Sequence, residues 1–232
     1  QHGPHLPTAT DTLLVSEVAR RAAVLAAGRY PVIVTPCVWT GLSEHHMELG
    51  GTVTLDFQVF AGLLRGIVES LVRQGFARVC LLNGHGGNVA ALKTITDELT
   101  FEFDIPVVSG TYWHIAAAAV DPLLERQKSI RHACEAETSM VLAIAPDLVD
   151  TGRLAAADRA DARDGVGGED PLYRWRGFAE KTGSGVLGIA SAGTAEKGER
   201  LLAAAAAVLA DRLVDPATWA PGLVIAAPSE GS

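Results

Sequence analysis

The sequence between residues 83 and 88, NGHGGN, follows an apolar run and precedes a segment with helical periodicity. In open α/β sheets, ligands bind at the carboxyl ends of the strands. Glycine lets the backbone approach a ligand closely, and an imidazole at that position can bind a metal or move a proton. His85 is therefore a candidate site residue, and a tight structural turn with an incidental histidine is the alternative.

A second group of polar side chains lies at the start of the sequence. It consists of His2, His5 and Asp11. Histidine is the commonest metal ligand, and a carboxylate a few positions later can bridge two metals from a folded-back loop. The alternative is a polar, frayed terminus, because this spacing is not that of a helical metal motif.

A third group, His132, Glu135 and Glu137, lies in a segment with helical periodicity from about residue 132 to 145. On a helix, His132 and Glu135 are three positions apart and share a face, whereas Glu137 lies further round. Acidic residues also favour the first turn of a helix because they interact well with its dipole. The group is therefore either part of a site or an ordinary helix start.

Two further groups follow predicted strands. Ser43-Glu44-His45-His46 lies in a Gly-rich loop, where His45 and His46 are better interpreted as pocket lining or surface than as metal ligands. Trp113 and His114 follow another apolar run, and Trp113 is either a pocket wall or core. Because these groups and His85 fall at one predicted sheet edge, we expect them to converge on a single site.

The elements that would position these residues alternate along the chain. Apolar runs at 31–36, 77–84 and 105–110 predict buried strands, and helices are expected at about 10–28, 56–74, 88–103, 115–126, 132–145 and 194–214. This alternation is typical of an α/β fold with a mostly parallel sheet covered on both faces. We expect one domain over residues 1–232, with a surface excursion at 150–181 and a flexible tail at 222–232.

Composition excludes several other classes of protein. The net charge of −8 without a Lys/Arg cluster argues against a nucleic-acid partner, and no apolar run is long enough for a membrane helix. The first residues lack the basic and apolar regions of a signal peptide. Three cysteines without a CxxC motif favour a reducing compartment, so we expect a cytoplasmic protein.

In order and spacing, several motifs resemble those of the creatininase family, a group of metal-dependent amidohydrolases. They are Gln1-His2-Gly3-Pro4-His5-Leu6-Pro7 with Asp11, Gly51-Thr52, the NGHGGN motif at 83–88, His132-Ala133 with Glu137-Thr138-Ser139, Gly185-Val186-Leu187-Gly188, and Ala195-Glu196-Lys197-Gly198. The resemblance spans nearly the whole chain. It implies a three-layer α/β/α fold and a homo-oligomer, a hexamer in many family members.

The resemblance also implies a site with two divalent metals per chain, which could be Zn, Mn or Fe. By resemblance, His2 and His85 are metal ligands and Asp11 bridges the metals. Glu137 resembles a site carboxylate that meets a metal or its bound water, and His132 resembles the family's catalytic histidine.

The expected reaction is hydrolysis of a C–N bond in a small, cyclic amide by metal-bound hydroxide. His132 would protonate the departing nitrogen, and the backbone N–H of Gly86 or Gly87 would help to hold the oxyanion. Trp113, His45 and His46 would shape the substrate pocket. Alternatives within the family are a formamide hydrolase and a peptidase, and the alternative outside it is a non-catalytic metal- or ligand-binding protein.

Two positions depart from the family pattern. The family motif reads Glu-Gln-His-Gly, so its metal-binding Glu would fall immediately before Gln1, as would an upstream strand. The hypotheses are a truncated chain or a protein with one ligand fewer. Creatininase itself carries a Glu where this chain has Gly87, so the sequence resembles the broader NGHGGN branch.

Overall fold

The computed structural model describes residues 1–159 and 173–220. Its central sheet contains two parallel strands, β1 (Val79–Asn83) and β2 (Val107–Thr111), paired from Val79 opposite Val107 to Asn83 opposite Thr111. The strands predicted at 77–84 and 105–110 are confirmed. Because both strands run in the same direction, the motifs that follow them meet at one edge of the sheet.

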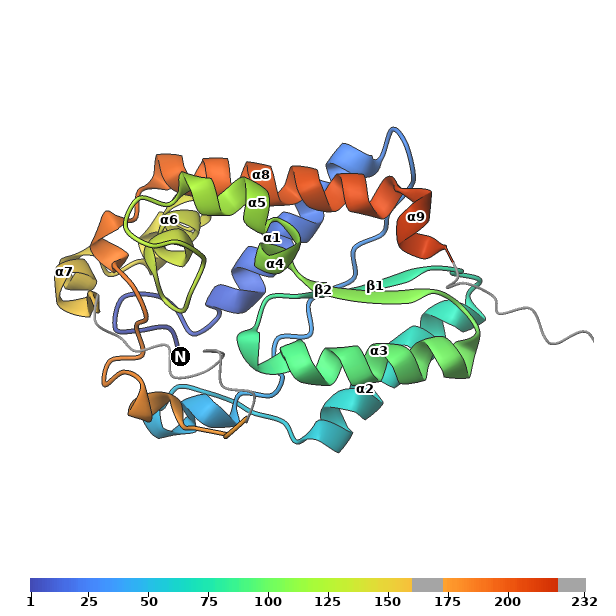
Figure 1. Cartoon of the computed structure of the whole chain (residues 1–232), viewed down its shortest axis with the longest axis horizontal. Helices are drawn as coiled ribbons and strands as arrows, with labels where there is room; N and C mark the ends of the chain where they lie inside the picture. The colour runs from blue at the N-terminus through green and yellow to red at the C-terminus, as the bar shows by residue number, and fades with distance from the viewer. Residues whose placement is uncertain (160–172, 221–232) are drawn as a thin grey trace, which may run out of the picture.

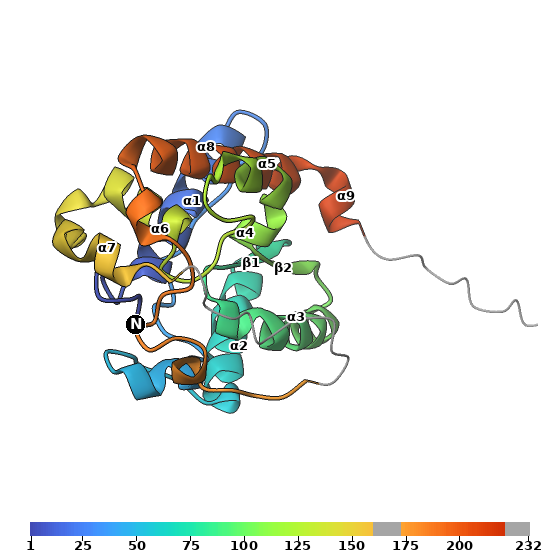
Figure 2. The same cartoon turned by 60° about the vertical axis from the view of Figure 1, so that its left-hand side comes forward.

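Helices cover both faces of this sheet, which confirms the three-layer α/β/α fold (Figure 1). One layer contains α1 (Thr10–Ala26), α4 (Tyr112–Ile115), α5 (Ala117–Val120), α6 (Glu135–Ile144) and α8 (Ala195–Val214). The opposite layer contains α2 (Phe57–Arg73) and α3 (Val89–Phe103). Short helices α7 (Leu154–Ala157) and α9 (Pro216–Trp219) lie at the two ends of the first layer (Figures 1 and 2).

The helix starts follow from capping side chains in the sequence. The Asp56 carboxylate accepts a hydrogen bond from the Val59 N–H at 2.8 Å, and the Thr194 hydroxyl accepts one from the Lys197 N–H at 3.2 Å. Each cap satisfies one of the N–H groups that have no partner within the helix. The predicted starts of α2 and α8 are therefore accurate to within one residue.

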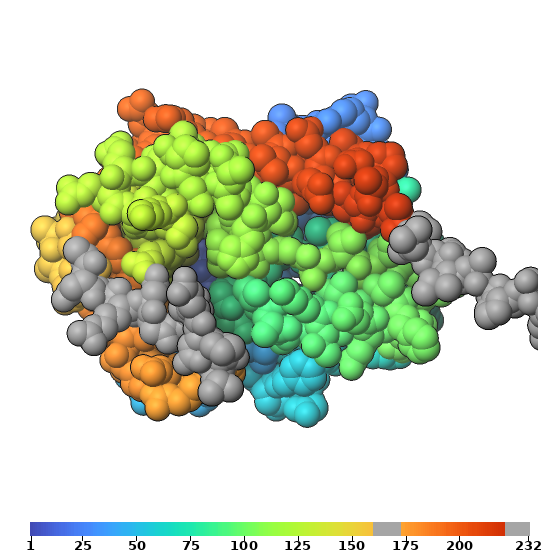
Figure 3. Space-filling model, viewed as in Figure 1, coloured from blue at the N-terminus to red at the C-terminus, as the bar shows by residue number. Residues whose placement is uncertain are grey.

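Two hydrophobic cores lie on the two sides of the sheet. The larger is built mainly by α1, α6 and α8, and its fully buried members include Leu14, Val18, Met140, Leu201 and Leu202. The smaller, around Phe60, Val68 and Ile95, packs α2 and α3 against the sheet. In the space-filling view the α8 and α4–α5 side of the molecule and the α3 side form two halves (Figure 3).

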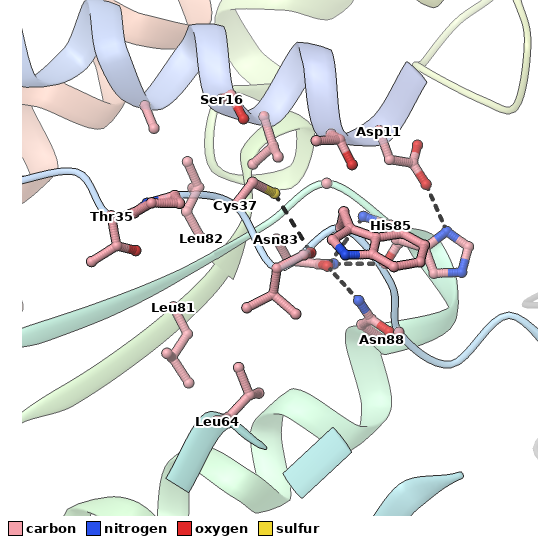
Figure 4. A pocket seen from close by; sticks show the side chains of 18 of the residues that line it. Asp11, Ser16, Thr35, Cys37, Leu64, Leu81, Leu82, Asn83, His85 and Asn88 are labelled. Atoms are coloured by element: carbon pink, nitrogen blue, oxygen red, sulfur yellow. Dashed lines mark hydrogen bonds and ion pairs between the residues drawn. The ribbon is translucent and has the colours of Figure 1, made fainter. Parts of the chain in front are cut away.

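The prediction of a strand at 31–36 is wrong. The segment is extended, but none of its residues joins a ladder, and the Ile33 side chain is 71% exposed. A strand needs a hydrogen-bonded neighbour. Instead, a cavity of about 740 Å³ lies between this segment and β1, with Thr35 and Cys37 on one side and Leu81 and Leu82 on the other (Figure 4).

Two predicted helices also differ from the structure. The helix expected at 115–126 is divided into α4, α5 and a single 3-10 turn at Asp121–Leu123. The helix expected from His132 begins at Glu135, because Ala133 has a φ of +51° that no right-handed helix contains. His132 and Glu135 therefore do not share a helix face.

The excursion predicted at 150–181 is only partly on the surface. Its first part forms a 3-10 turn at Thr151–Arg153 and α7, and its last part places a buried Phe178 at the start of the 3-10 turn Phe178–Glu180. Its middle, 160–172, lies outside the described residues, as does the tail at 222–232. Among the helices described, none has the length and apolar character to cross a membrane.

Candidate metal centre

Asp11 connects two histidines that are far apart in the sequence. It lies in the first turn of α1, and its two carboxylate oxygens approach different rings: Oδ1 is 2.9 Å from His2 Nε2, and Oδ2 is 2.9 Å from His85 Nδ1 (Figure 4). One carboxylate held between two imidazoles is the arrangement that a bridging ligand requires. The three residues predicted as metal ligands or bridge around Asp11 are thus brought together.

The two asparagines of the NGHGGN motif hold the loop that carries His85. The Asn83 amide donates to the His85 carbonyl at 2.7 Å and accepts from the His85 N–H at 3.1 Å. Asn88 donates to Asn83 at 3.2 Å (Figure 4) and accepts from the Leu42 N–H at 2.9 Å. The loop is therefore fixed to itself and to the segment that precedes the His45-His46 pair.

Two glycines of the same motif are required by close approach. A Cβ on Gly84 would lie 2.8 Å from Val15 Cβ and 3.0 Å from the Asp11 carbonyl oxygen, so only glycine lets the loop pack against α1. A Cβ on Gly87 would collide with the Leu42 carbonyl oxygen and lie 2.6 Å from His85 Nε2. Gly87 therefore occupies a position that no larger residue could fill without displacing His85 or Leu42.

Both ring nitrogens of His85 have polar neighbours. Its Nε2 lies 3.2 Å from the Leu42 carbonyl oxygen and 3.2 Å from the Ser43 hydroxyl, and its Nδ1 lies 2.9 Å from Asp11 Oδ2. In the tautomer with the proton on Nε2, that nitrogen donates to the Leu42 carbonyl, and the lone pair of Nδ1 faces the Asp11 carboxylate. In that tautomer, Nδ1 and the carboxylate together could bind one metal.

A second cluster lies on the other side of Asp11. Ligand atoms of His2, His132 and Glu137 lie within 4.8 Å of one another, and the His2 and His132 ring centroids are 4.3 Å apart. Glu137 accepts a hydrogen bond from the Ala133 N–H, and His132 Nε2 donates to the Gln1 carbonyl oxygen at 2.8 Å. The left-handed Ala133 thus forms the turn that brings His132 and Glu137 to the same site.

His45 and His46 complete the surroundings of His85. They lie in the 3-10 helix Glu44–Leu49, and their ring centroids are 5.5 Å and 5.8 Å from that of His85. Ligand atoms of these three histidines also lie within 4.8 Å of one another. The His46 ring also contacts the His132 ring in a tilted arrangement, with centroids 4.6 Å apart, so this loop closes one side of the centre.

The charges of these groups are strongly coupled. Burial disfavours charge on His2, but the nearby Asp11 carboxylate outweighs this effect and raises the His2 pKa. Burial likewise opposes ionisation of Asp11, yet His2 and His85 hold the Asp11 pKa well below its usual range. Burial, reinforced by Asp11, raises the pKa of Glu137 to about 7 although His2 opposes it. Burial and the charge of His2 hold the His132 pKa well below its usual value.

These residues fit a divalent metal. Metal ligation needs imidazoles that are neutral and carboxyl groups that are ionised. Burial favours the neutral imidazole, because it holds the His132 pKa well below its usual value and lowers the His46 pKa to about 2. The buried Nδ1 atoms of His2 and His46 have no hydrogen-bond partner among the described residues. Buried polar atoms without a partner are rare in folded proteins, so these two nitrogens are candidates to bind a ligand.

The other predicted residues have mixed outcomes. Trp113 follows β2 as expected, but it packs against the larger hydrophobic core, and its ring contacts Tyr112 and His114. Gly86 and Gly87 form the turn after His85. His5 is buried and bonds Thr138 at 2.8 Å, so it braces the N-terminal loop against α6.

Sequence reasoning did not identify Phe178. Its ring is 4.3 Å from the His46 ring, 4.7 Å from the His132 ring and 6.0 Å from the His45 ring, measured between centroids. It comes from the part of the chain that was predicted to be a surface excursion. No local pattern marks it, because its role depends on contacts with residues more than 40 positions away.

Glu135 also has a role that differs from the prediction. Its buried carboxylate accepts from the backbone N–H groups of Glu125 and Arg126 at 2.9 Å each and pairs with Lys197 Nζ at 2.6 Å. It therefore holds the start of α6 to α8 and is not a member of the metal-binding clusters. Among the three acidic and histidine residues predicted there, only His132 and Glu137 reach the metal centre.

Comparison with known proteins agrees with this arrangement. The family model for creatininase, described as creatinine amidohydrolase, matches residues 1–213. A mycofactocin precursor peptide peptidase of Mycobacterium ulcerans is 31% identical over 227 residues, which cover 96% of this chain and 82% of that protein. A creatinine amidohydrolase of Pseudomonas putida is 30% identical over 233 residues, covering 92% and 84%.

Solved structures show the same fold. A crystal structure of creatinine amidohydrolase superimposes with a TM-score of 0.74 at 27% identity, covering 96% of this chain and 87% of that one. Two further creatininase structures, described as a Zn-Zn type and as a Mn form, match with TM-scores of 0.69 and 0.71. Their metals are of the kind that the residues around Asp11 can hold.

Proposed function

The chain belongs to the creatininase family of metal-dependent hydrolases, and we propose that it hydrolyses a C–N bond in a small, cyclic amide. The observation that carries the proposal is the position of the Asp11 carboxylate between His2 and His85, with Glu137 and His132 beside it. This set combines metal-binding groups with a neutral imidazole that can carry a proton.

His2, Asp11, His85 and Glu137 would hold two divalent ions of zinc, manganese or iron, with Asp11 shared between them. A divalent ion in such a site lowers the pKa of water toward neutrality and polarises a carbonyl oxygen. With its proton on Nε2, His85 would donate to the Leu42 carbonyl oxygen and present the Nδ1 lone pair to the metal.

His132 is the proposed proton carrier. Because its Nε2–H donates to the Gln1 carbonyl oxygen, the lone pair is on Nδ1, and its depressed pKa keeps the ring neutral and able to accept a proton. It would take the proton that the attacking water loses and deliver it to the departing nitrogen. The backbone N–H groups of Gly86 and Gly87 begin a 3-10 turn, where N–H groups lack helical partners and can face an oxyanion.

The pocket walls would be supplied by His45, His46 and Phe178. The cavity of about 740 Å³ that runs beside β1 is also lined by His2, Asp11, His46 and His85, so the centre is reached from an apolar space. Trp113, at the same sheet edge, is proposed to contribute to the wall of the substrate pocket. A homo-oligomer and a cytoplasmic location are proposed on the family resemblance and the cysteine pattern.

A second candidate, hydrolysis of a peptide, is favoured by a specific observation. The relative from M. ulcerans, 31% identical over most of both chains, is named as a peptidase for a precursor peptide. Both reactions hydrolyse an amide C–N bond at a metal centre, and they differ in the size of the group that must leave the site.

Substrate panels separate the two. The metal-loaded protein is assayed against cyclic amides such as hydantoin and creatinine, against formamides, and against linear peptides, with ring opening or new amine measured. The proposal predicts turnover of cyclic amides that requires both metal and His132, and His132→Gln should retain metal but lose turnover. Turnover of linear peptides alone would favour the second candidate, and no turnover of any amide by fully metallated protein would refute both.

A further inference from the structure

One cation near the metal centre forms no ion pair with an acidic residue in the part of the chain that the structure describes. Lys181 follows the 3-10 turn that carries Phe178, and its side chain is half-buried. None of the carboxylates in residues 1–159 and 173–220 forms an ion pair with it, whereas the buried Lys197 pairs with Glu125 and Glu135. A partly desolvated ammonium without a counter-ion is a favourable place for an anion from outside the protein.

Phe178 places this cation beside the centre. The Lys181 ammonium lies 5.4 Å from the Phe178 ring centroid, and the same ring lies 4.3 Å from His46 and 4.7 Å from His132. Lys181 Nζ is therefore within about 10 Å of the His132 ring. The segment that carries both residues packs against the loop of His45 and His46, as Figures 1 and 2 show from two sides.

The charges around Lys181 are mixed. Desolvation lowers the Lys181 pKa, nearby Arg176 adds to this effect, and Glu180 only partly opposes it. Arg176 is exposed, and the Glu48 carboxylate lies against Gly177. Lys181 is therefore a partly desolvated cation beside a second cation, and an anion in contact with it would stabilise its charge.

We propose that Lys181, held over the ring of Phe178, binds a carboxylate of the substrate, so that the preferred substrate is an amide carrying a carboxylate a few bonds from its scissile C–N bond. This inference rests on the proposed function, because it specifies the substrate class of the same centre. A carboxylate that pairs with Lys181 would orient the amide toward His132 and Asp11. It would also favour an anionic amide over a neutral amide of the same size.

The test compares two ligands of the same size, N-acetylglycine and N-acetylglycinamide, in which a neutral carboxamide replaces the carboxylate. Their dissociation constants for the zinc-loaded protein are measured by calorimetry. The wild type should bind N-acetylglycine about tenfold more tightly, because one charge-assisted hydrogen bond has that order of effect. Lys181→Met should remove most of this preference by weakening the acid alone, whereas Lys181→Arg should keep it.

Lys93 provides the matched control, because it is an exposed lysine on α3. Lys93→Met should leave both dissociation constants unchanged. Equal binding of the two ligands by the wild type would overturn the inference, as would a preference that survives in Lys181→Met, since the metals alone would then bind the carboxylate. Zinc uptake and turnover of neutral amides are measured in parallel, so a failure of the proposed function is seen separately from a failure of this inference.

Discussion

Replacing Lys197 with methionine tests how the second half of the metal centre is held in place. Lys197 Nζ lies 2.6 Å from Glu135 Oε1, 3.0 Å from the Ala192 carbonyl oxygen and 3.3 Å from Glu125 Oε1. The side chains of Lys197 and Glu135 are 5% and 0% exposed. In Lys197→Met the Glu135 carboxylate would stay buried without its cation, although it keeps two backbone N–H donors.

Breaking one partner of a buried pair costs roughly 3 to 5 kcal/mol. For a chain of this length, 1 kcal/mol shifts the melting temperature by roughly 2 to 4 °C. We therefore expect Lys197→Met to lower the melting temperature by about 6 to 20 °C, measured by circular dichroism with a chelator present. Metal binding should weaken as well, because Glu135 is the first residue of α6 and Glu137 follows two residues later in the same first turn.

The matched control is Glu199→Gln, which breaks an ion pair between Glu199 and Arg21 in which Glu199 is 59% exposed. Such exposed pairs contribute about 0 to 1 kcal/mol, so this variant should melt within about 4 °C of the wild type. A double-mutant cycle with Glu135→Gln should give a coupling of about 1.5 kcal/mol or more. If Lys197→Met melts as Glu199→Gln does, or if the coupling is near zero, this account of how α6 is anchored is wrong.

Three other predictions follow from the site. Gly87→Ala should reduce zinc retention after gel filtration by roughly 10-fold or more, because the added Cβ would displace the Leu42 carbonyl that orients His85. Gly86→Ala is the control, because that position has open space for a Cβ. Equal zinc retention by the two variants would contradict this role of Gly87. Burial and the charge of His2 lower the His5 pKa from 6.5 to about 4. Between pH 6.5 and 4 the unfolded chain therefore binds a proton at His5 that the folded chain does not bind. The free energy of unfolding should fall as the pH falls through that window. His5→Asn should therefore flatten the dependence of the urea midpoint on pH between 6.5 and 4, and an unchanged slope would show that His5 does not titrate as described. His46→Leu should leave the fold intact but weaken substrate binding, because its ring contacts those of both Phe178 and His132. An unchanged KM would remove His46 from the pocket.

The parts of the site that could be predicted from the sequence are those encoded locally. A strand, a Gly-rich turn and a helix form one continuous segment, so β1, His85 and α3 follow from a single motif. Asp11 lies one residue inside a helix whose start the sequence also predicts. His2 and Asp11 are close in the chain, so a short loop is enough to bring them together.

The parts that could not be predicted depend on distant contacts. The segment at 31–36 has the composition of a strand, but a ladder also requires a neighbour, and here a cavity lies beside it. The start of α6 depends on the left-handed Ala133, whose conformation is fixed by contacts with Glu137 and with Leu187, which donates its N–H to the His132 carbonyl at 2.9 Å. Phe178 and Lys181 lie in a segment whose sequence gives no sign of the histidines that they approach.

Metal content is the most direct test of the central claim, which is that Asp11 unites His2 and His85 in a metal centre. The wild type and Asp11→Asn are prepared with zinc or manganese in excess, passed through gel filtration, and analysed for metal per chain, with circular dichroism to confirm the fold. We predict about one to two tightly held ions in the wild type and a loss of roughly 10-fold or more in Asp11→Asn. A folded wild type that holds no metal, or a folded Asp11→Asn that holds as much as the wild type, would contradict the account.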